Sequence, residues 1–454
     1  MPQSPARPRS ERRGHQGPAR GGSAQARLPH SRMIGLLRKI IPAPLLSAYH
    51  LVLAHAGAVV YRFPSRELVV VAVTGTKGKS TTVELVAELL RVSGKKTASA
   101  STIRFCIDGV CERNLYKMTM PGRFFLQRFL RRAVDAGCTH VVVEMTSEGA
   151  LQHRHKGVEL NALVFTNLQP EHLERHGGME GYAAAKLSLA EHVANSPKRP
   201  RIIVANSDDK YGQKFLEIEA DLKAPYSLAD AEPYNTDDKN VRFVWRGELF
   251  TVPLPGVFNV YNCLAALTLG DALGLKKDDM KRALEHLPPI AGRQERVECG
   301  QPFAVVVDYA HTPDSLRALF EAYTSTTLST GKNKRIIAVI GSTGGGRDTW
   351  NRPEKGKIAE QYCDVVYIAN EDPYDEDPQQ ILTAIAKGFS IKTPHLTLDR
   401  RAAIAAALKE AREGDAILIT GKGTDPYIMG PRGSKQVWSD AGVAGEELKK
   451  LGYN

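Results

Sequence analysis

An apolar run, a glycine-rich turn and an amphipathic segment follow one another directly in residues 68–94, and this order constrains the fold more than any other feature. The run LVVVAV (68–73) predicts a buried strand, and TTVELVAELLRVSG (81–94) has apolar residues at helical spacing. The turn TGTKGKS (74–80) contains glycines that let backbone N–H groups point toward an anion at the start of the helix. The sequence therefore predicts a strand–loop–helix unit that binds phosphate.

The loop also supplies the side chains that nucleotide binding requires. Lys79 adds positive charge, and the hydroxyl of Ser80 is a ligand for Mg²⁺. The general phosphate-loop pattern has an earlier glycine where this chain has Val73, and a glycine turn that merely enters a helix is the alternative. We expect the phosphates of ATP to contact Gly75, Thr76, Lys77, Gly78, Lys79, Ser80 and Thr81.

Further apolar runs, separated by helical segments, predict two α/β domains. Runs without polar alternation indicate parallel strands that are covered on both faces. Two such domains in tandem favour an active site between them. The runs of the first series are 141–145, 162–167 and 202–206, and those of the second are 303–310, 335–342, 364–370 and 415–423. The predicted segments are a disordered basic tail (1–32), a helical extension (33–66), a central domain (67–292) and a C-terminal domain (293–454).

The net charge of +11 does not indicate a nucleic-acid-binding protein, because much of it lies in the tail. Residues 1–32 contain seven arginines and one acidic residue, Glu11, a balance of +6 that leaves +5 for the rest. An Arg-, Pro-, Gly- and Ser-rich segment has little to bury, so we expect disorder there, with Met33 as an alternative start. Without interleaved aromatic residues, the tail would bind nucleic acid only nonspecifically.

The six cysteines are scattered and form no Cys-x-x-Cys pair. This distribution suggests neither a structural zinc site nor a disulfide framework. The expected location is a reducing cytoplasm.

Residues 45–61 contain no Asp, Glu, Lys or Arg and follow the basic pair Arg38-Lys39. The segment is short for a membrane span of about 20 residues, and it contains His50 and His55. Three interpretations stay open: a helix packed on the enzyme, a helix on the membrane surface, and a span or signal. Peripheral membrane contact through residues 33–61 is therefore one of the expectations.

Later segments place the phosphate loop in a wider pattern. In order, they are VEMTSEGALQHR (143–154), FTNLQPEHLERHGGMEGYAAAK (165–186), PGVFNVYNCLAAL (255–267), AGRQERV (291–297), DYAHTP (308–313) and GKGTDPY (421–427). Together with the loop, they resemble the landmarks of the Mur ligase family, in its MurE-type, tripeptide-forming branch. The resemblance implies a central phosphate-loop ATPase domain, a Rossmann-like C-terminal domain, and an ATP-dependent ligase that activates a carboxylate as an acyl phosphate.

The resemblance also implies a metal site. Glu144 ends an apolar strand, where a carboxylate is unusual, and the family pattern makes Glu144 and His172 ligands of Mg²⁺ beside Ser80. Lys186 matches the lysine that the family carbamylates with CO₂ to N6-carboxylysine, which turns a cation into an anion that can hold a second Mg²⁺. The alternatives are a structural histidine and a surface lysine.

Five further positions match the nucleotide contacts of the family. Asn259 and Asn262 correspond to its adenine-side asparagines, because amides can read a base edge. Arg293 corresponds to a phosphate contact and Asp308 to a ribose contact, with His311 in the same cleft. The catalytic residues implied by the resemblance are Lys79, Lys186 and Arg293.

The acceptor and the amino acid are less clearly specified. The residues that correspond to contacts with a muramyl-peptide precursor are Thr119, Thr146, Gln152 and Arg154. A family Thr-Thr-Pro is Thr119-Met120-Pro121 here, and a Ser-Ser-His is Thr146-Ser147-Glu148, so some contacts differ.

The arginine with which diaminopimelate-adding enzymes clamp the distal carboxylate is Tyr374 in this chain. A phenol does not replace a bidentate guanidinium, so the amino acid stays open. Asp372 and Asp425 are candidates to receive an amino group, as lysine would offer.

The start of the chain leaves the acceptor open as well. Only about 35 residues separate Met33 from the central domain, which is too few for the uridine-nucleotide-binding domain of a complete MurE-type enzyme. Whether the acceptor carries UDP, and the oligomeric state, are therefore not specified. The alternative functions are a related ligase on another substrate, such as folylpolyglutamate, and a nucleotide-binding scaffold that does not ligate.

Overall fold

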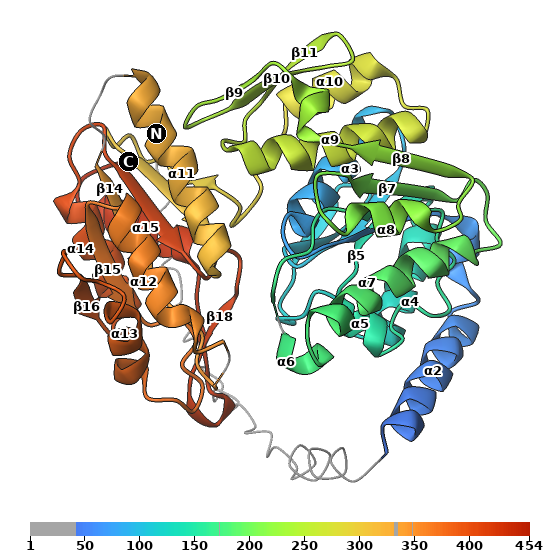
Figure 1. Cartoon of the computed structure of the whole chain (residues 1–454), viewed down its shortest axis with the longest axis horizontal. Coiled ribbons are helices and arrows are strands. Elements are labelled where there is room, and N and C mark those ends of the chain that lie inside the picture. Colours follow the sequence, from blue (N-terminus) through green and yellow to red (C-terminus); the bar gives the residue numbers. More distant parts are fainter. Residues whose placement is uncertain (1–41, 172, 331–334, 347) are drawn as a thin grey trace, which may run out of the picture. The chain divides into compact units, whose positions relative to one another are not determined.

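The computed structural model describes residues 42–171, 173–330, 335–346 and 348–454. Residues 49–454 form one compact unit, which contains two large sheets with helices packed on them (Figure 1). The sheets lie on either side of Gly292 in the sequence. The domain boundaries expected from the sequence stay predictions.

In the described residues, the first sheet has eight strands in the order β4-β3-β2-β5-β1-β6-β7-β8. The strands β2, β5, β1, β6, β7 and β8 run parallel. Their bounds are β1 Val69–Thr74, β2 Thr97–Ala100, β3 Arg104–Ile107, β4 Val110–Arg113, β5 His140–Glu144, β6 Ala162–Phe165, β7 Ile202–Asn206 and β8 Leu222–Tyr226.

Helices cover both faces of this sheet, which explains why its central strands β1, β5, β6 and β7 are mainly apolar. Val71 and Val73 of β1 pack in the core beneath α3, α9 and α10, whereas Val70 and Ala72 pack beneath α4 and α7 on the opposite face. The helices of the first face are α3 Lys79–Val92, α9 Val257–Ala272 and α10 Lys277–Glu285. The helices on the side of the second face are α4 Arg123–Asp135, α5 Ser147–Leu151, α6 Leu173–His176, α7 Met179–Ala194 and α8 Gly212–Glu217.

The hairpin β3–β4 is an antiparallel addition that the apolar pattern did not predict. Cys106 and Cys111 face each other across it and form a disulfide, so the expectation of no disulfide is wrong for this pair. The pairing follows from the tight turn at Asp108-Gly109, where both residues have positive φ and bring the two strands into register. A spacing of five residues between cysteines does not reveal this in the sequence.

A small antiparallel sheet of β9 Tyr234–Thr236, β10 Val241–Trp245 and β11 Glu248–Val252 was also not predicted. Its inward side chains, among them Phe243 and Phe250, join the core beneath α9 and α10. The turn Arg246-Gly247 between β10 and β11 has positive φ at both residues, which suits a two-residue hairpin.

The second sheet has six strands within the described residues, in the order β12-β13-β17-β14-β15-β16, and only β12 is antiparallel. The helices α11, α12 and α13 cover one face, and α14 and α15 cover the other. The strands are β12 Glu295–Arg296, β13 Ala304–Asp308, β14 Ile336–Ile340, β15 Val365–Ala369, β16 His395–Thr397 and β17 Ala416–Thr420. The helices are α11 Pro313–Thr330, α12 Asn351–Tyr362, α13 Pro378–Ala386, α14 Arg400–Glu410 and α15 Asp440–Lys450.

The remaining elements are short, apart from one N-terminal helix. This helix, α2, spans Ala43–Val60 and falls in the segment that the sequence left with three interpretations. Among the described residues, no helix has the length and apolar character needed to cross a membrane. The short elements are the 3₁₀ turns η1 Pro64–Glu67, η2 Leu228–Ala231 and η3 Pro431–Gly433, and the hairpin of β18 Tyr427–Met429 and β19 Lys435–Val437.

Candidate active site

The loop between β1 and α3 has the backbone shape that a phosphate site needs. Gly75 and Gly78 have φ of 150° and 80°, values that favour glycine. A Cβ on Gly75 would overlap Thr166, and a Cβ on Gly78 would overlap the amide of Asn262. This tight fit explains why the loop has glycine at both positions. The loop places the N-terminus of α3 next to the carboxyl ends of β1, β5 and β6.

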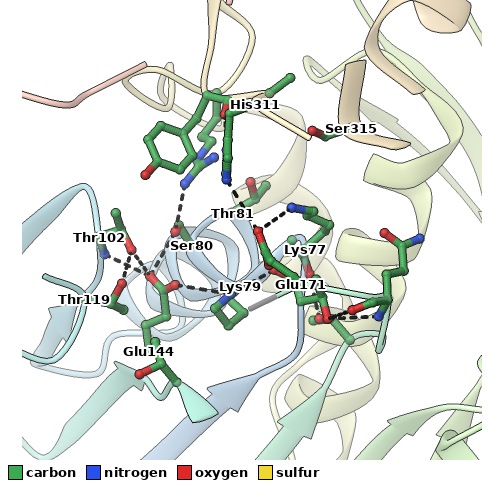
Figure 2. A pocket seen from close by; sticks show the side chains of 18 of the residues that line it. Lys77, Lys79, Ser80, Thr81, Thr102, Thr119, Glu144, Glu171, His311 and Ser315 are labelled. Carbon is green, nitrogen blue, oxygen red and sulfur yellow. Dashed lines mark hydrogen bonds and ion pairs between the residues drawn. The ribbon is translucent and has the colours of Figure 1, made fainter. Parts of the chain in front are cut away.

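Glu144, at the end of β5, is the centre of a cluster of oxygen atoms beside this loop. Its Oε2 accepts hydrogen bonds from Ser80 Oγ at 2.9 Å, Thr102 N at 2.8 Å and Thr102 Oγ1 at 3.0 Å. Thr119 Oγ1 lies 2.8 Å from Thr102 Oγ1, and the side chains turn toward one another in Figure 2. The carboxylate is buried, so these contacts compensate for its lost hydration.

This cluster fits a hard divalent cation. Ser80 and Glu144 offer a hydroxyl and a carboxylate, which are the donors that Mg²⁺ prefers when phosphate and water fill its other positions. The third predicted ligand, His172, lies outside the described residues. Within the part of the chain that the structure describes, no three His, Cys, Asp or Glu side chains form a metal cluster by themselves.

Lys79 lies beside the same carboxylate. Its Nζ donates to Thr76 O at 2.9 Å and lies 3.8 Å from Glu144 Oε1. Burial lowers the pKa of Lys79, and the neighbouring Glu144 opposes that effect. A cation held in this way is placed to neutralise phosphate charge.

Lys186, on α7, is fully buried behind the loop. Its Nζ donates to Gly75 O at 2.6 Å and lies 4.8 Å from the ring centre of Tyr182. Burial, and secondly the charge of Lys79, hold the pKa of Lys186 well below its ordinary value. Both effects favour the neutral, nucleophilic amine over the ammonium.

Glu171 contacts both the phosphate loop, through Lys77, and the C-terminal part of the chain, through His311. Lys77 Nζ donates to Glu171 Oε1 at 2.9 Å, and His311 Nε2 lies 3.4 Å from the same oxygen (Figure 2). His311 Nδ1 lies 2.9 Å from Tyr309 O, which fixes its ring. Lys77 and His311 therefore share one partner, although they are 234 positions apart in the sequence. The sequence does not predict this shared contact.

The predicted nucleotide contacts line the other end of the loop. On α9, Asn262 Nδ2 donates to Asn259 Oδ1 at 3.0 Å, and Asn259 Nδ2 donates to Gln294 Oε1 at 3.0 Å. Asp308 accepts from Gln294 N at 2.8 Å and from Ala310 N at 2.7 Å. Burial raises the pKa of Asp308, while the charge of Arg293 opposes this.

Arg293 reaches from the start of the C-terminal part to the phosphate loop. Its Nη2 donates to Ser80 Oγ at 3.2 Å, and its guanidinium lies 4.5 Å from the ring centre of Tyr309. Stacking on an aromatic ring fixes the plane of the guanidinium and leaves its N–H edge toward the loop. This geometry suits a contact with phosphate.

The residues predicted to hold the acceptor are partly engaged with one another. Thr146 caps α5 by accepting from Gly149 N at 3.1 Å. Arg154 donates to Gln152 Oε1 at 2.8 Å through Nη2 and to Met120 O through Nη1. Thr146 therefore has a structural role in addition to any substrate contact.

Asp372 and Asp425 form a four-charge cluster with two lysines. Lys117 Nζ lies 2.7 Å from Asp372 Oδ2 and 2.9 Å from Asp425 Oδ2. Lys422 Nζ lies 2.9 Å from Asp372 Oδ1 and 3.0 Å from Asp425 Oδ2. Burial lowers the pKa of Lys117, but the two carboxylates outweigh it and the net pKa is raised. Both aspartates therefore already bind ammonium groups.

One cavity of about 790 Å³ contains most of these groups. Gly75 and Gln152 are not among its lining residues; their predicted roles, like those of the other site residues, stay predictions. The predicted residues that line it are Thr76, Lys77, Gly78, Lys79, Ser80, Thr81, Thr119, Glu144, Thr146, Arg154, Lys186, Asn259, Asn262, Arg293, Asp308, His311, Asp372 and Asp425.

Sequence reasoning did not find several lining residues. Thr102 and Lys117 lie in loops without a recognisable motif, and Lys355 is an isolated lysine on a helix. Glu371 Oε1 accepts from Thr343 Oγ1 at 2.9 Å, and its buried Oε2 has no hydrogen-bond partner among the described residues. Unlike those three, Glu371 lies in the stretch 370–374 that the sequence predicts to meet the incoming amino acid, directly after an apolar run, where parallel sheets place functional groups.

Comparisons with known proteins agree with this geometry. Residues 73–270 match the Mur ligase middle domain, and residues 292–423 match the Mur ligase glutamate ligase domain. The UDP-N-acetylmuramoyl-L-alanyl-D-glutamate–2,6-diaminopimelate ligase of Solibacter usitatus (strain Ellin6076) is 36% identical over 413 residues, which are 88% of this chain and 81% of that protein. A UDP-N-acetylmuramyl-tripeptide synthetase of Roseiflexus sp. (strain RS-1) is 36% identical over 439 residues, 91% of this chain and 85% of that protein.

Solved structures have the same fold. A UDP-N-acetylmuramoyl-L-alanyl-D-glutamate–2,6-diaminopimelate ligase superposes with a TM-score of 0.58 and 28% identity, covering 85% of this chain and 79% of that one. A folylpolyglutamate synthase of Mycobacterium tuberculosis has a TM-score of 0.68 with 18% identity, covering 89% of this chain and 96% of that one. The second likeness concerns the fold alone.

Proposed function

Because the chain belongs to the Mur ligase family of ATP-dependent, ADP-forming amide ligases, we propose that it joins an amino acid to a UDP-N-acetylmuramyl-dipeptide-like acceptor in the synthesis of peptidoglycan precursors. One observation supports this most: Lys79, Glu144 and Arg293 converge on a phosphate loop in the cavity that also contains Asp372 and Asp425. The reaction belongs in the cytoplasm, where ATP is available. The expected membrane contact through residues 33–61 is independent of this reaction.

The proposed reaction has two steps and no protein nucleophile. The acceptor carboxylate attacks the γ-phosphorus of ATP, the bond to the bridging oxygen breaks, and ADP leaves an acyl phosphate. The neutral amine of the amino acid then attacks the acyl carbon, inorganic phosphate departs, and the amine proton passes to solvent. Lys79 and Arg293 hold the phosphate oxygens as charge moves between them.

Mg²⁺ is part of the proposal because the family uses it and the donor set suits it. Ser80 and Glu144 would hold the ion, with His172 as the further predicted ligand. When bound, the ion neutralises phosphate charge and orients the γ-phosphate. Lys79 and Thr102 contact the Glu144 carboxylate and orient it toward the loop.

We include carbamylation of Lys186 in the proposal. Its depressed pKa favours the neutral amine, whose lone pair can attack the carbon of CO₂, and loss of one proton then gives an anionic carbamate. An anion at this place would attract a cation near the phosphates, whereas an ammonium would repel it. The contact of Nζ with Gly75 O places the group directly behind the loop.

The structure supports an ammonium-binding role for Asp372 and Asp425. Lys117 already puts an ammonium between the two carboxylates at 2.7 and 2.9 Å. We propose that the amino group of the incoming amino acid competes for this position. Tyr374 occupies the position at which diaminopimelate-adding enzymes have an arginine that binds the distal carboxylate. Without that arginine, an amino acid with no distal carboxylate, such as lysine or ornithine, is favoured over diaminopimelate.

The test is amine-dependent release of phosphate from ATP and Mg²⁺ with UDP-muramyl-dipeptide and a panel of lysine, ornithine and diaminopimelate. The proposal predicts release that requires both the acceptor and an amine, with Lys79→Ala as the inactive control. Release with a folate-type acceptor instead would assign the chain to the related ligases. Tight ATP binding without any release would assign it to the scaffolds, and clear preference for diaminopimelate would contradict the inference from Tyr374.

A further inference from the structure

On the helix α2 (Ala43–Val60), small residues face the enzyme at two positions, whereas several large apolar residues face outward. Ala54 and Ala58 are buried, whereas the exposed fractions of Val52 and Val59 are 66% and 60%. Tyr49 and Val60 are exposed as well. A helix on the surface of a water-soluble domain normally has the reverse arrangement, with large apolar side chains toward the core.

The inward face is built for close approach and fixes the helix firmly. A Cβ on Gly157 would lie 2.8 Å from Ala58 Cβ and 3.2 Å from Ala54 O, so only glycine allows this packing. Gln127 Nε2 donates to Gly157 O at 3.0 Å directly beneath the helix. The outward side chains are therefore held in place by a rigid contact.

The C-terminal end of the helix is also tied to the enzyme. Arg131 of α4 donates from Nε to Tyr61 O at 3.1 Å and from Nη2 to Arg62 O at 3.2 Å. These contacts satisfy carbonyl groups that a helix end leaves unpaired. The orientation of the outward face is thus determined at this end of the helix.

The outward face is a largely apolar stripe, in which the exposed His55 lies one turn from both Val52 and Val59. Tyr49, Val52, Ala56 and Val59 follow one another at spacings of three and four residues, which places them on one side of a helix. Leu51 and Val60, both exposed, widen the stripe beyond a narrow seam. The helix contains no Asp, Glu, Lys or Arg, so it lacks the charged flanks by which paired helices choose a partner.

The sequence that precedes the helix and directly follows it is mostly basic, although Glu67 comes next and Arg66 Nε lies 2.8 Å from Glu159 Oε1. From Arg12 to Arg66 the sequence contains nine basic residues and no acidic residue. Two of them, Arg62 and Arg66, follow the helix directly and are exposed. An apolar face that ends at the exposed Arg62 complements a bilayer surface, where acyl chains lie beneath anionic head groups.

We propose that the outward face of α2, formed by Tyr49, Val52, Val59 and Val60, is a binding surface for an anionic phospholipid bilayer. The helix would lie in the plane of the interface, with these side chains at the level of the first acyl carbons and Arg62 at the phosphates. Such a surface brings the ligase to the membrane without spanning it. The inference goes beyond the ligase reaction and does not depend on it.

Sedimentation with vesicles tests this proposal on the full chain. We expect binding to phosphatidylcholine vesicles with about 30% phosphatidylglycerol, several-fold weaker binding to phosphatidylcholine alone, and weaker binding as salt rises from about 0.1 to about 0.5 M. The double variant Val52→Gln/Val59→Gln should lose about tenfold or more of the binding. Its thermal midpoint should change little, because both side chains are exposed.

The matched control is Ile391→Gln/Val437→Gln, which removes two apolar side chains with exposed fractions of 88% and 80% elsewhere on the protein. This variant should bind vesicles like the wild type. The proposal is overturned if the wild type does not bind anionic vesicles or if both double variants bind equally. It is also overturned if sedimentation velocity shows a dimer that only Val52→Gln/Val59→Gln abolishes, without lipid binding. Tyr49→Gln repeats the test should that double variant fail to fold.

Discussion

Two lysines beside the phosphate loop have different environments and, in this account, different tasks. Lys79 has a carboxylate within 3.8 Å, which favours its charged form despite burial. Lys186 has a carbonyl and an aromatic ring as its near contacts, and burial dominates. Because burial favours the neutral, nucleophilic amine at Lys186, we propose the carbamate at Lys186 and phosphate binding at Lys79.

Replacing Lys186 tests this assignment. Lys186→Ala should lower turnover by about a hundredfold or more, because an anion near the phosphates is lost. Added formate, a small carboxylate, should restore part of the activity in this variant but not in Lys79→Ala. The measurement is steady-state phosphate release with and without formate.

The control for Lys186 is Lys210→Ala. Lys210 Nζ also lies over a tyrosine ring, at 5.0 Å from that of Tyr211, but the side chain is exposed. Its removal should leave turnover unchanged. Wild-type turnover in Lys186→Ala would rule out the carbamate.

Lys355 gives a prediction about pH and stability. Burial lowers its pKa from 10.5 to about 8, so the folded protein disfavours the ammonium. The unfolded chain binds more protons between these two values, and stability therefore rises with pH across that window. Below pH 8 both states are protonated and the full cost, about 3 kcal/mol, is present.

Lys355→Met should therefore be more stable than the wild type at pH 7, by about 1 kcal/mol after the loss of two hydrogen bonds worth about 1 kcal/mol each. These bonds join Nζ to Gly341 O at 3.2 Å and to Ser342 Oγ at 3.1 Å. The order should reverse near pH 10. Urea unfolding at both pH values measures this, and a pH-independent difference would contradict a depressed pKa.

At the residue scale, the sequence was informative where a motif fixed the position. Lys79 and Ser80 follow glycines at the start of a helix, and Glu144 interrupts an apolar run, so their location at one sheet edge could be predicted. Thr102 and Lys117 could not, because they reach the site from loops whose course depends on the β3–β4 hairpin. The contact of Lys117 with Asp372 and Asp425 was missed for the same reason, whereas Lys422 lies in the segment GKGTDPY (421–427) that the sequence singles out.

At the element scale, α3 joins the phosphate loop to the core. Its N-cap, Gly78, has φ of 80°, and Gly94 just beyond its C-terminal end has φ of 76°. The first faces Asn262, whereas nothing lies within 4 Å of a Cβ on the second. Replacing Gly94 would therefore change backbone strain alone, whereas replacing Gly78 would change both backbone strain and the shape of the site.

Gly78→Ala and Gly94→Ala should each lose about 1 kcal/mol of stability, because both place an alanine at positive φ. Only Gly78→Ala should also weaken ATP binding, by about tenfold or more, because the Cβ displaces the Asn262 amide. Calorimetric titration with ATP compares the two. Equal ATP affinities would mean that the loop does not hold the nucleotide.

The elements themselves were predictable in proportion to their burial. Strands β1, β5, β6, β7, β13, β14, β15 and β17 are mainly apolar because both faces are covered, and each begins within one residue of the start of its predicted run and ends within three residues of its end. The hairpins β3–β4 and β9–β11 are short and partly exposed, and their polar residues resemble loops. Their pairing is decided by turns and by contacts that the pattern does not contain.

At the scale of the whole molecule, Lys117 connects the two halves of the site. It reaches from the loop after β4 to Asp372 and Asp425 on the C-terminal part. Without Lys117, the two carboxylates would face the single positive charge of Lys422. A substrate ammonium in the place of Lys117 would make the cluster neutral again. The cluster therefore couples binding of the amino acid to the contact between the two halves.

Lys117→Met should lower the KM for a diamino acid about threefold or more, because a competing ammonium is removed, while the KM for ATP should not change. Initial rates over a range of amine concentrations measure this. Lys210→Ala, far from the cluster in sequence and exposed, is the comparison. A raised KM for the acceptor with no change for the amine would instead make Lys117 an acceptor contact.

The mass of the acceptor after the reaction tests the central claim most directly. Incubation of the enzyme with ATP, Mg²⁺, UDP-muramyl-dipeptide and lysine should increase the acceptor mass by one amino acid less one water, with one ADP formed for each product. The account predicts this product with the wild type and none with Lys79→Ala. ATP consumption without any gain in acceptor mass would contradict a ligase of muramyl peptides.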